Sequence, residues 1–158
     1  MRTIVFVFVL MLLFNKGNAQ DFAKERAEIN SVINQFSQSI RNKDSVSFLR
    51  LFTPKSFQWI GVVKDNSHQE VQADGNATFN NYFFNDYTVF YKFLGDKGKQ
   101  EEIFENIVIT NDDVIGSVTF DYQYWNNGKI TNWGKEYWTL VKMNGSWKIV
   151  NVVYSITE

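Results

Sequence analysis

Hydrophobic and polar positions follow a helical period from Asp21 to about Arg41. Apolar residues recur at steps of three and four, while lysine, glutamate, glutamine and asparagine occupy the intervening positions. This pattern predicts a long amphipathic helix. Its apolar side would carry Phe22, Ile29, Val32, Ile33, Phe36 and Ile40. A second, short helix is expected to begin at a cap on Asp44 or Ser45, to bury Phe48, Leu51 and Phe52, and to end before Pro54.

The rest of the chain reads mainly as strands. Phe57–Val63 is a β-rich run, the segment 64–75 is polar and typical of a turn, and 77–84 suits a short helix, although 80–95 fits helix and strand equally well. Four further runs are separated by Asn-, Asp- and Gly-rich turns, which favour hairpins. They predict a four-stranded antiparallel meander at Glu102–Thr110, Val114–Trp125, Thr131–Lys142 and Ser146–Ile156.

The Asn144-Gly145 turn predicts which side chains of the last two strands share a face. If these two residues form the turn, Met143 pairs with Ser146, and this register extends along both strands. One face then carries Gly134, Glu136, Trp138 and Leu140 beside Trp147, Ile149, Asn151, Val153 and Ser155. The other face carries Tyr137, Thr139 and Val141 beside Val150, Val152, Tyr154 and Ile156.

Both faces are largely apolar, whereas a sheet with one face in water normally alternates. We therefore expect one face to pack on the helices and the other on a second copy of the chain. The alternative is that tyrosine, threonine and valine on the second face are ordinary strand formers exposed to solvent.

Glu136 and Asn151 are the polar exceptions among the large rings of the first face. A carboxylate that points inward among tryptophans must be paired or have a raised pKa, which is also how a general base or a ligand anchor arises. The alternative is that Glu136 lies at the open rim of the sheet, solvated or paired with a lysine. The other acidic pairs, Glu101-Glu102 and Asp112-Asp113, read as charged turns or solvated strand ends.

The first 19 residues have the outline of an export signal. A positive start at Arg2 precedes the apolar run Ile4–Phe14, and Gly17 and Ala19 suit a peptidase that would leave Gln20 as the new N-terminus. The alternative is a buried N-terminal strand or helix. On the first interpretation residues 20–158 form one exported domain, periplasmic or secreted, with no membrane segment after cleavage.

The composition of the chain limits the kinds of partner and of chemical site that we expect. The chain has no cysteine, which excludes disulfides, thiolate metal sites and a cysteine nucleophile. Loss of residues 1–19 removes two basic residues and no acidic one, and the net charge moves from −1 to −3. Nucleic acid is not an expected partner of such a chain. No cofactor motif, calcium loop or metal cluster is recognisable, so we expect no metal and no cofactor.

The order of these elements resembles the nuclear transport factor 2-like superfamily, in particular its small exported bacterial members of unassigned activity. The resemblance rests on Phe57–Val63, Val118–Tyr124, Gly128, Thr131–Trp138, Gly145–Ile149 and Tyr154-Ser155. It implies an α+β, cystatin-like cone fold, in which N-terminal helices pack in the concave face of a strongly curved, mostly antiparallel sheet. It also implies a cavity at the open end of the cone and dimerisation through the sheet.

The family's catalytic patterns are absent from the matching positions. Its isomerases need an aspartate on the strand after the helix pair, but here Ser56–Gly61 contains no acid. Its cyclases and dehydratases use a His–Asp pair, and the single histidine, His68, lies in a polar segment. Function therefore does not follow from the fold.

Three functions remain open. The first is binding of a small apolar or aromatic molecule in a cavity lined by Trp59, Tyr122, Tyr124 and Trp138, with Glu136 and Asn151 as polar anchors. The second is an isomerase, hydro-lyase or cyclase that uses Glu136 as its base. The third is a non-catalytic, homodimeric interaction module whose cavity is filled by its own side chains.

Overall fold

The computed structural model describes residues 21–53, 58–73, 80–85, 89, 94–95 and 97–158. Its helices are α1 (Ala23–Asn42), α2 (Ser45–Arg50) and α3 (Asp65–Ala73). The strands are β1 (Gln58–Val63), β2 (Tyr82–Asn85), β3 (Gln100–Asn111), β4 (Ile115–Asn126), β5 (Lys129–Met143) and β6 (Ser146–Ile156). The export signal expected at residues 1–19 and the start at Gln20 lie outside the described residues. In the described part of the chain no helix combines the length and hydropathy that crossing a membrane requires.

The two N-terminal helices form as their sequence predicts. Lys43 adopts a left-handed conformation (φ 56°) and closes the C-terminus of α1 by donating its backbone N–H to Ile40. Asp44 caps α2, because its carboxylate accepts the backbone N–H of Ser47 at 3.0 Å. The pair is joined by side chains, with the rings of Phe36 and Phe48 5.0 Å apart.

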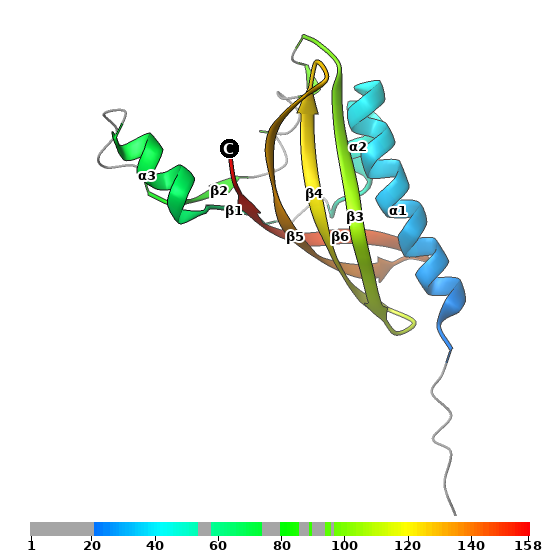
Figure 1. The fold of residues 1–158 in the computed structure, drawn as a ribbon. Helices are drawn as coiled ribbons and strands as arrows, with labels where there is room; N and C mark the ends of the chain where they lie inside the picture. The colour runs from blue at the N-terminus through cyan, green and yellow to red at the C-terminus, as the bar shows by residue number, and fades with distance from the viewer. Residues whose placement is uncertain (1–20, 54–57, 74–79, 86–88, 90–93, 96) are drawn as a thin grey trace, which may run out of the picture.

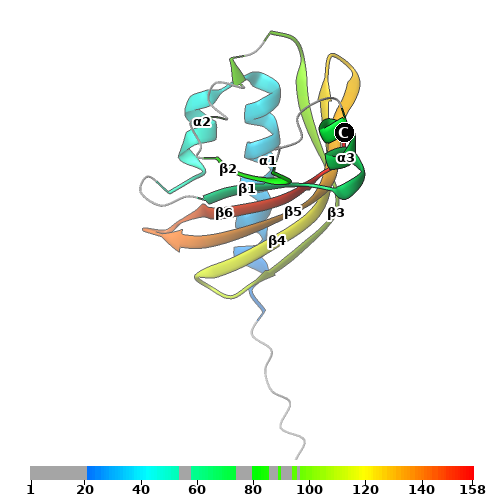
Figure 2. The same ribbon diagram turned by 90° about the vertical axis from the view of Figure 1, so that its left-hand side faces the viewer.

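All six strands form one curved sheet in the order β2-β1-β6-β5-β4-β3. Every neighbouring pair is antiparallel except β1 and β6, which are parallel. Helices α1 and α2 lie on the concave side of this sheet, and α3 projects from the end at which β1, β2 and the C-terminus meet (Figure 1, Figure 2). The α+β cone fold and the C-terminal meander are confirmed.

A β-bulge corrects the predicted register of the last hairpin. Residues Leu140–Met143 pair with Ser146–Ile149 as the Asn144-Gly145 turn requires, but Thr139 then pairs with Asn151. Val150 is the extra residue, and beyond it the two faces of β6 are exchanged. Tyr154 therefore lies beside Glu136, where the turn-based register had placed Val153 and Ser155.

The core is an aromatic cluster between α1 and the sheet. The ring of Phe36, in the middle of α1, lies 4.7 Å from Trp138 on β5, 5.9 Å from Phe104 on β3 and 6.2 Å from Trp59 on β1. Phe36 and Trp138 are almost completely buried. A single helix residue thus packs against rings from three strands.

Between β1 and β2 the expectations were partly wrong. The segment predicted as a polar turn contains α3, whose first turn is closed by the His68 N–H donating to the Lys64 carbonyl. No glycine or proline interrupts Asp65–Ala73, and its glutamine, glutamate and alanine favour helix without an apolar stripe. By sequence the segment 80–95 fits helix and strand equally well, and within it Tyr82–Asn85 is a strand, so the short helix suggested at 77–84 does not extend over 80–84; residues 77–79 lie outside the described residues.

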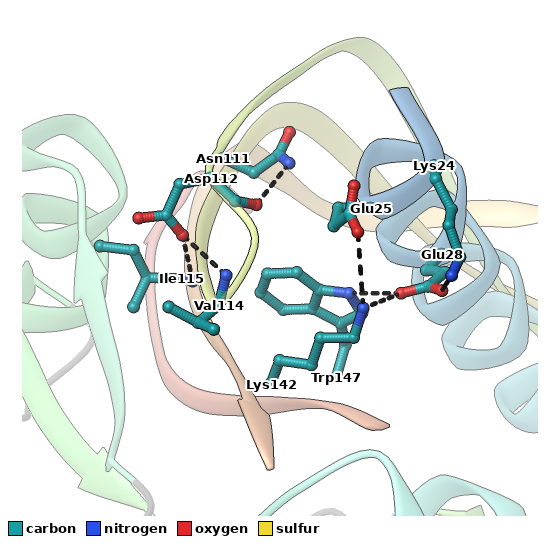
Figure 3. Close-up of polar contacts among 9 residues, drawn as sticks. All are labelled: Lys24, Glu25, Glu28, Asn111, Asp112, Val114, Ile115, Lys142 and Trp147. Carbon is teal, nitrogen blue, oxygen red and sulfur yellow. Dashed lines mark hydrogen bonds and ion pairs between the residues drawn. The ribbon is translucent and has the colours of Figure 1, made fainter. Parts of the chain in front are cut away.

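An ion network ties the start of α1 to the last hairpin (Figure 3). The Lys142 ammonium lies 2.7 Å from Glu28 and 3.8 Å from Glu25. Glu28 also accepts the indole N–H of Trp147 at 3.0 Å, and the Lys142 hydrogen bond is the main cause that lowers the pKa of Glu28. This network orients the helix on the sheet at the end of β5 and β6.

Candidate functional site

A cavity of about 280 Å³ lies near the junction of β1, β2 and the C-terminal end of β6. Five of its twelve described lining residues are aromatic, five are glutamate or asparagine, and two are aliphatic. It is lined by Trp59, Phe83, Asn85, Val89, Glu102, Tyr122, Tyr124, Asn132, Glu136, Tyr154, Ile156 and Glu158. A small concave site with apolar walls and few polar groups is the usual form of a ligand pocket.

Glu136 reaches this cavity from β5. It alternates with the exposed Tyr137 and shares the inner face with Trp138, and only 2% of its surface is exposed. The Trp138 indole N–H donates to the Glu136 carboxyl at 2.5 Å. Burial raises the pKa of Glu136 to about 8, and the Trp138 hydrogen bond opposes that rise. The alternative that Glu136 is a solvated rim residue is therefore wrong.

Glu102 on β3 is a second buried carboxyl in the same cavity. Its surface is 7% exposed, and its pKa is raised well above the usual range, first by burial and then by the charge of Glu136. The interpretation of Glu102 as a solvated strand end is wrong. Two residues from Glu102, Phe104 is packed against the core, so the period of the strand was a signal that both side chains point inward.

A missing side chain at Gly134 allows β5 to approach the end of β6 closely. A Cβ at Gly134 would lie 1.9 Å from the carbonyl oxygen of Ser155 on β6, so only glycine at this position of β5 allows the two backbones to come this close. The same carbonyl accepts the hydroxyl of Tyr122 at 3.0 Å. Burial, aided by the charges of Glu136 and Glu102, raises the pKa of Tyr122, which keeps its hydroxyl a donor.

A second glycine makes room for an aromatic wall. The ring of Phe83, on β2, lies directly over Gly61 of β1, where an added Cβ would be 2.3 Å from the tip of the ring. Tyr154 adjoins both Phe83 and Trp59, with ring centroids 6.1 and 6.2 Å away. Burial raises the pKa of Tyr154, and the neighbouring Trp59 side chain opposes that rise.

Four of the six predicted ligand residues line the cavity: Trp59, Tyr122, Tyr124 and Glu136. Trp138 lies behind them and reaches the cavity through Glu136. Asn151 does not belong to the site, because the bulge pairs it with the exposed Thr139 on the outer face. Sequence reasoning missed Glu102, Tyr154, Phe83 and Glu158, which reach the cavity through long-range pairing and the exchanged face of β6.

The other candidate chemistry lies elsewhere. His68 is on α3 and is not among the cavity residues. Within the described ranges no three histidine, cysteine, aspartate or glutamate side chains are grouped so that they could hold a metal ion.

Comparison with known proteins places the fold and not the activity. No family model matches the chain, and no curated protein matches it. Solved structures do match. An NTF2-like protein of unknown function from Shewanella baltica OS155 has a TM-score of 0.60 at 14% identity, over 87% of this chain and 98% of that one. An NTF2-like superfamily protein from Salmonella enterica gives 0.60 at 20% identity, over 85% and 92%.

One match carries the name of an enzyme. The putative scytalone dehydratase from Novosphingobium aromaticivorans has a TM-score of 0.65 at 14% identity, over 86% of each chain. At these identities the likeness concerns the fold alone.

Proposed function

From the premise that this chain has the nuclear transport factor 2-like fold, we propose that it binds a small, largely apolar or aromatic molecule in the cavity beside Glu136. The observation that carries this proposal is the burial of two carboxyl groups, Glu102 and Glu136, in a cavity with aromatic walls. A buried carboxyl costs folding free energy unless it is paired. Two of them at one cavity are typical of a site that is kept for what it binds.

The test uses a neutral aromatic probe, 2-phenylethanol, followed by nuclear magnetic resonance of the indole N–H groups. Binding should shift the signals of Trp59, which lines the cavity, and Trp138, which donates to Glu136. The Trp147 signal should not move, because that indole bonds Glu28 at the far end of the sheet. Equal shifts of all three, or none at millimolar probe, would contradict the proposal.

A matched pair of variants localises the site. Asn132→Trp fills the cavity from β5, whereas Lys129→Trp puts the same ring on an exposed position of that strand. The first should abolish the probe-induced shift of Trp138, and the second should leave it unchanged.

The buried acid pair also favours a second candidate, an enzyme that moves protons with Glu136 as base and Glu102 as its acidic neighbour. A carboxyl whose pKa lies near neutral is suited to general acid–base catalysis. The name of the Novosphingobium match, a putative dehydratase, is compatible with this class.

The enzyme is tested with 2-tetralone that is deuterated at the carbon beside its carbonyl. Loss of deuterium faster than in buffer, abolished in Glu136→Gln, supports the enzyme, and loss at the buffer rate contradicts it.

The outer face of the sheet supports association with a second copy of the chain. A row of mostly apolar residues crosses all six strands in register: Phe84, Ile60, Val153, Tyr137, Thr119 and Val108. Phe84 and Val108 are 67% and 58% exposed, Tyr137 is half exposed, and the row is continuous. Val152, Tyr154 and Ile156, which we had expected on this face, point inward instead.

This homodimer through the sheet is tested by sedimentation at micromolar concentration. The wild type should sediment at twice the monomer mass and Tyr137→Lys as a monomer. A monomeric wild type contradicts the dimer and, with it, the interaction module.

Export through residues 1–19 is a further part of the proposal. Expression of the full sequence in a bacterial host should yield a periplasmic or secreted protein whose mass corresponds to a start at Gln20. A protein that retains Met1 to Ala19 contradicts it.

A further inference from the structure

The ionisable side chains that line the cavity are all acidic groups, glutamates and tyrosines, among the described residues. Its polar groups include the carboxyls of Glu102, Glu136 and Glu158 together with tyrosine hydroxyls and two asparagines. Among the residues that the structure describes, no lysine, arginine or histidine lines it. An anionic ligand would therefore find no cation in the lining to balance its charge, whereas a cationic ligand would find carboxyl groups that can ionise and pair with it.

The carboxyl oxygens of Glu102 and Glu136 can accept more hydrogen bonds than the described residues donate to them. Glu102 is more than nine-tenths buried, and no hydrogen bond to its side chain exists within the described part of the chain. One oxygen of Glu136 accepts the Trp138 indole N–H, and its other oxygen accepts no hydrogen bond from the described residues. A buried polar group without a partner costs free energy that a donor on a ligand would recover.

The walls suit an organic cation better than a metal ion. Trp59, Tyr122, Tyr124 and Tyr154 present rings around the carboxyls, and aromatic faces attract ammonium groups that are removed from water. The carboxyls themselves, in contrast, are not grouped as metal ligands among the described residues. Room for an apolar body of a few carbon atoms remains in the 280 Å³ of the cavity.

We infer that the ligand of this cavity carries a protonated amine, held by Glu102 and Glu136 within the aromatic walls. This inference rests on the proposed binding function and names the chemical class of its ligand. The ammonium N–H groups donate to the two carboxyls, and the apolar part of the ligand lies against Trp59 and Tyr154.

Binding of such a ligand is linked to a proton. In the free protein burial raises the pKa of both Glu102 and Glu136, and the pKa of Glu136, about 8, keeps that carboxyl mostly neutral at pH 7. A bound ammonium stabilises the carboxylate, and one proton leaves the pair for solvent. The other titratable groups around the pair are Glu158, Tyr122, Tyr124 and Tyr154. Burial raises the pKa of Tyr122 and of Tyr154, so their hydroxyls stay protonated from pH 5 to 8, and the affinity for an amine should rise with pH across that range.

The experiment compares three probes of one size at pH 7: 2-phenylethylamine, 2-phenylethanol and phenylacetate. The amine should bind at least about ten-fold more tightly than the alcohol, a difference of about 1.4 kcal/mol, and phenylacetate should bind most weakly. Calorimetry in two buffers of different ionisation enthalpy should show proton release with the amine alone.

Substitutions of Glu102 and Glu136 test whether these carboxyls cause the preference for the amine over the alcohol. Glu136→Gln and Glu102→Gln should each reduce the preference for the amine at least five-fold while the alcohol still binds. Glu105→Gln, an exposed position on the same strand β3, is the control and should change nothing. If Glu136→Gln does not fold, the pH dependence of the wild type decides in its place.

The outcomes separate this inference from the function on which it rests. If the alcohol binds as tightly as the amine, or if the affinity for the amine falls from pH 5 to 8, the inference of an amine ligand is overturned. The proposed binding function is then left intact. Failure of all three probes to bind contradicts both.

Discussion

Trp138 donates its indole N–H to the carboxyl of Glu136, two residues earlier on the same face of β5, at 2.5 Å. The bond joins the centre of the core to the cavity, because the other side of the Trp138 ring packs on Phe36 of α1. The position of Glu136 is therefore set by the core and not by a mobile loop. Sites whose polar groups are held in this way bind without first being ordered.

Replacement of Trp138 tests this link. Trp138→Phe removes the donor that lowers the pKa of Glu136, so the pKa of that carboxyl should rise further. The smaller ring also leaves a void in the core, which should lower the free energy of unfolding by roughly 1–3 kcal/mol. Carbon-13 titration of Glu136 and urea unfolding measure the two effects. An unchanged or lower pKa would show that the hydrogen bond has no such role.

The raised pKa values predict an unusual dependence of stability on pH. The pKa of Glu136 is about 8 in the folded chain against 4.5 for an ordinary glutamate, so between these values the folded state holds more protons than the unfolded state. Stability is then fully present below about pH 4.5 and falls as pH rises toward 8, by roughly 3–5 kcal/mol from this group.

Urea unfolding from pH 4.5 to 8 measures that decline, and Glu136→Gln should make it markedly smaller. In that variant Glu102 still contributes to the decline of stability with pH, because burial raises its pKa as well. Glu105→Gln should follow the wild type. A wild-type stability that rises over this window would contradict the burial of the two acids.

The sequence predicted elements whose signals are local. The α1 helix shows its apolar stripe directly, Asp44 is a recognisable cap, and the Asn-Gly turn places Met143 opposite Ser146. The alternation of its strand through Trp138 made Glu136 a candidate inward carboxyl, with a solvated position at the rim as the alternative. Each of these features depends on residues within a few positions of one another.

What was missed depends on contacts between distant residues. The bulge at Val150 leaves no mark in the turn, yet it moves Tyr154 into the cavity and Asn151 out of it. Glu102 becomes a cavity residue only because β3 pairs it with Tyr124 and the sheet curves toward Glu136. The α3 helix has no apolar period to reveal it.

Two glycines of the sheet, Gly61 and Gly134, should respond differently to replacement by alanine. In Gly61→Ala the new methyl meets the tip of the Phe83 side chain, which can turn away, so stability should change little while the cavity changes shape. In Gly134→Ala it meets the backbone of Ser155 at 1.9 Å, so the end of β6 must move, at a cost of about 1–3 kcal/mol or more.

Unfolding curves and probe titrations of both variants check this contrast. Gly61→Ala should unfold near the wild type and bind 2-phenylethanol with altered affinity. A large loss of stability in Gly61→Ala, or none in Gly134→Ala, would contradict the arrangement.

The ion network at the other end of the sheet should stabilise the helix without affecting the cavity. Lys142→Met removes the cation shared by Glu25 and Glu28, so the pKa of Glu28 should rise toward its ordinary value and the melting temperature should fall by a few degrees at low salt. The difference from the wild type should shrink at high salt. Probe binding should be unaltered, and a loss of binding would show that the two ends are coupled.

We propose above all that Glu136 is a buried carboxyl in a cavity that a ligand can enter. Carbon-13 titration of the Glu136 carboxyl, without and with saturating 2-phenylethanol, tests it most directly. We predict a pKa far above the 4.5 of an ordinary glutamate in the free protein, and a further change when the probe is bound. A Glu136 that titrates near 4.5, or whose titration the bound probe does not alter, would contradict the account.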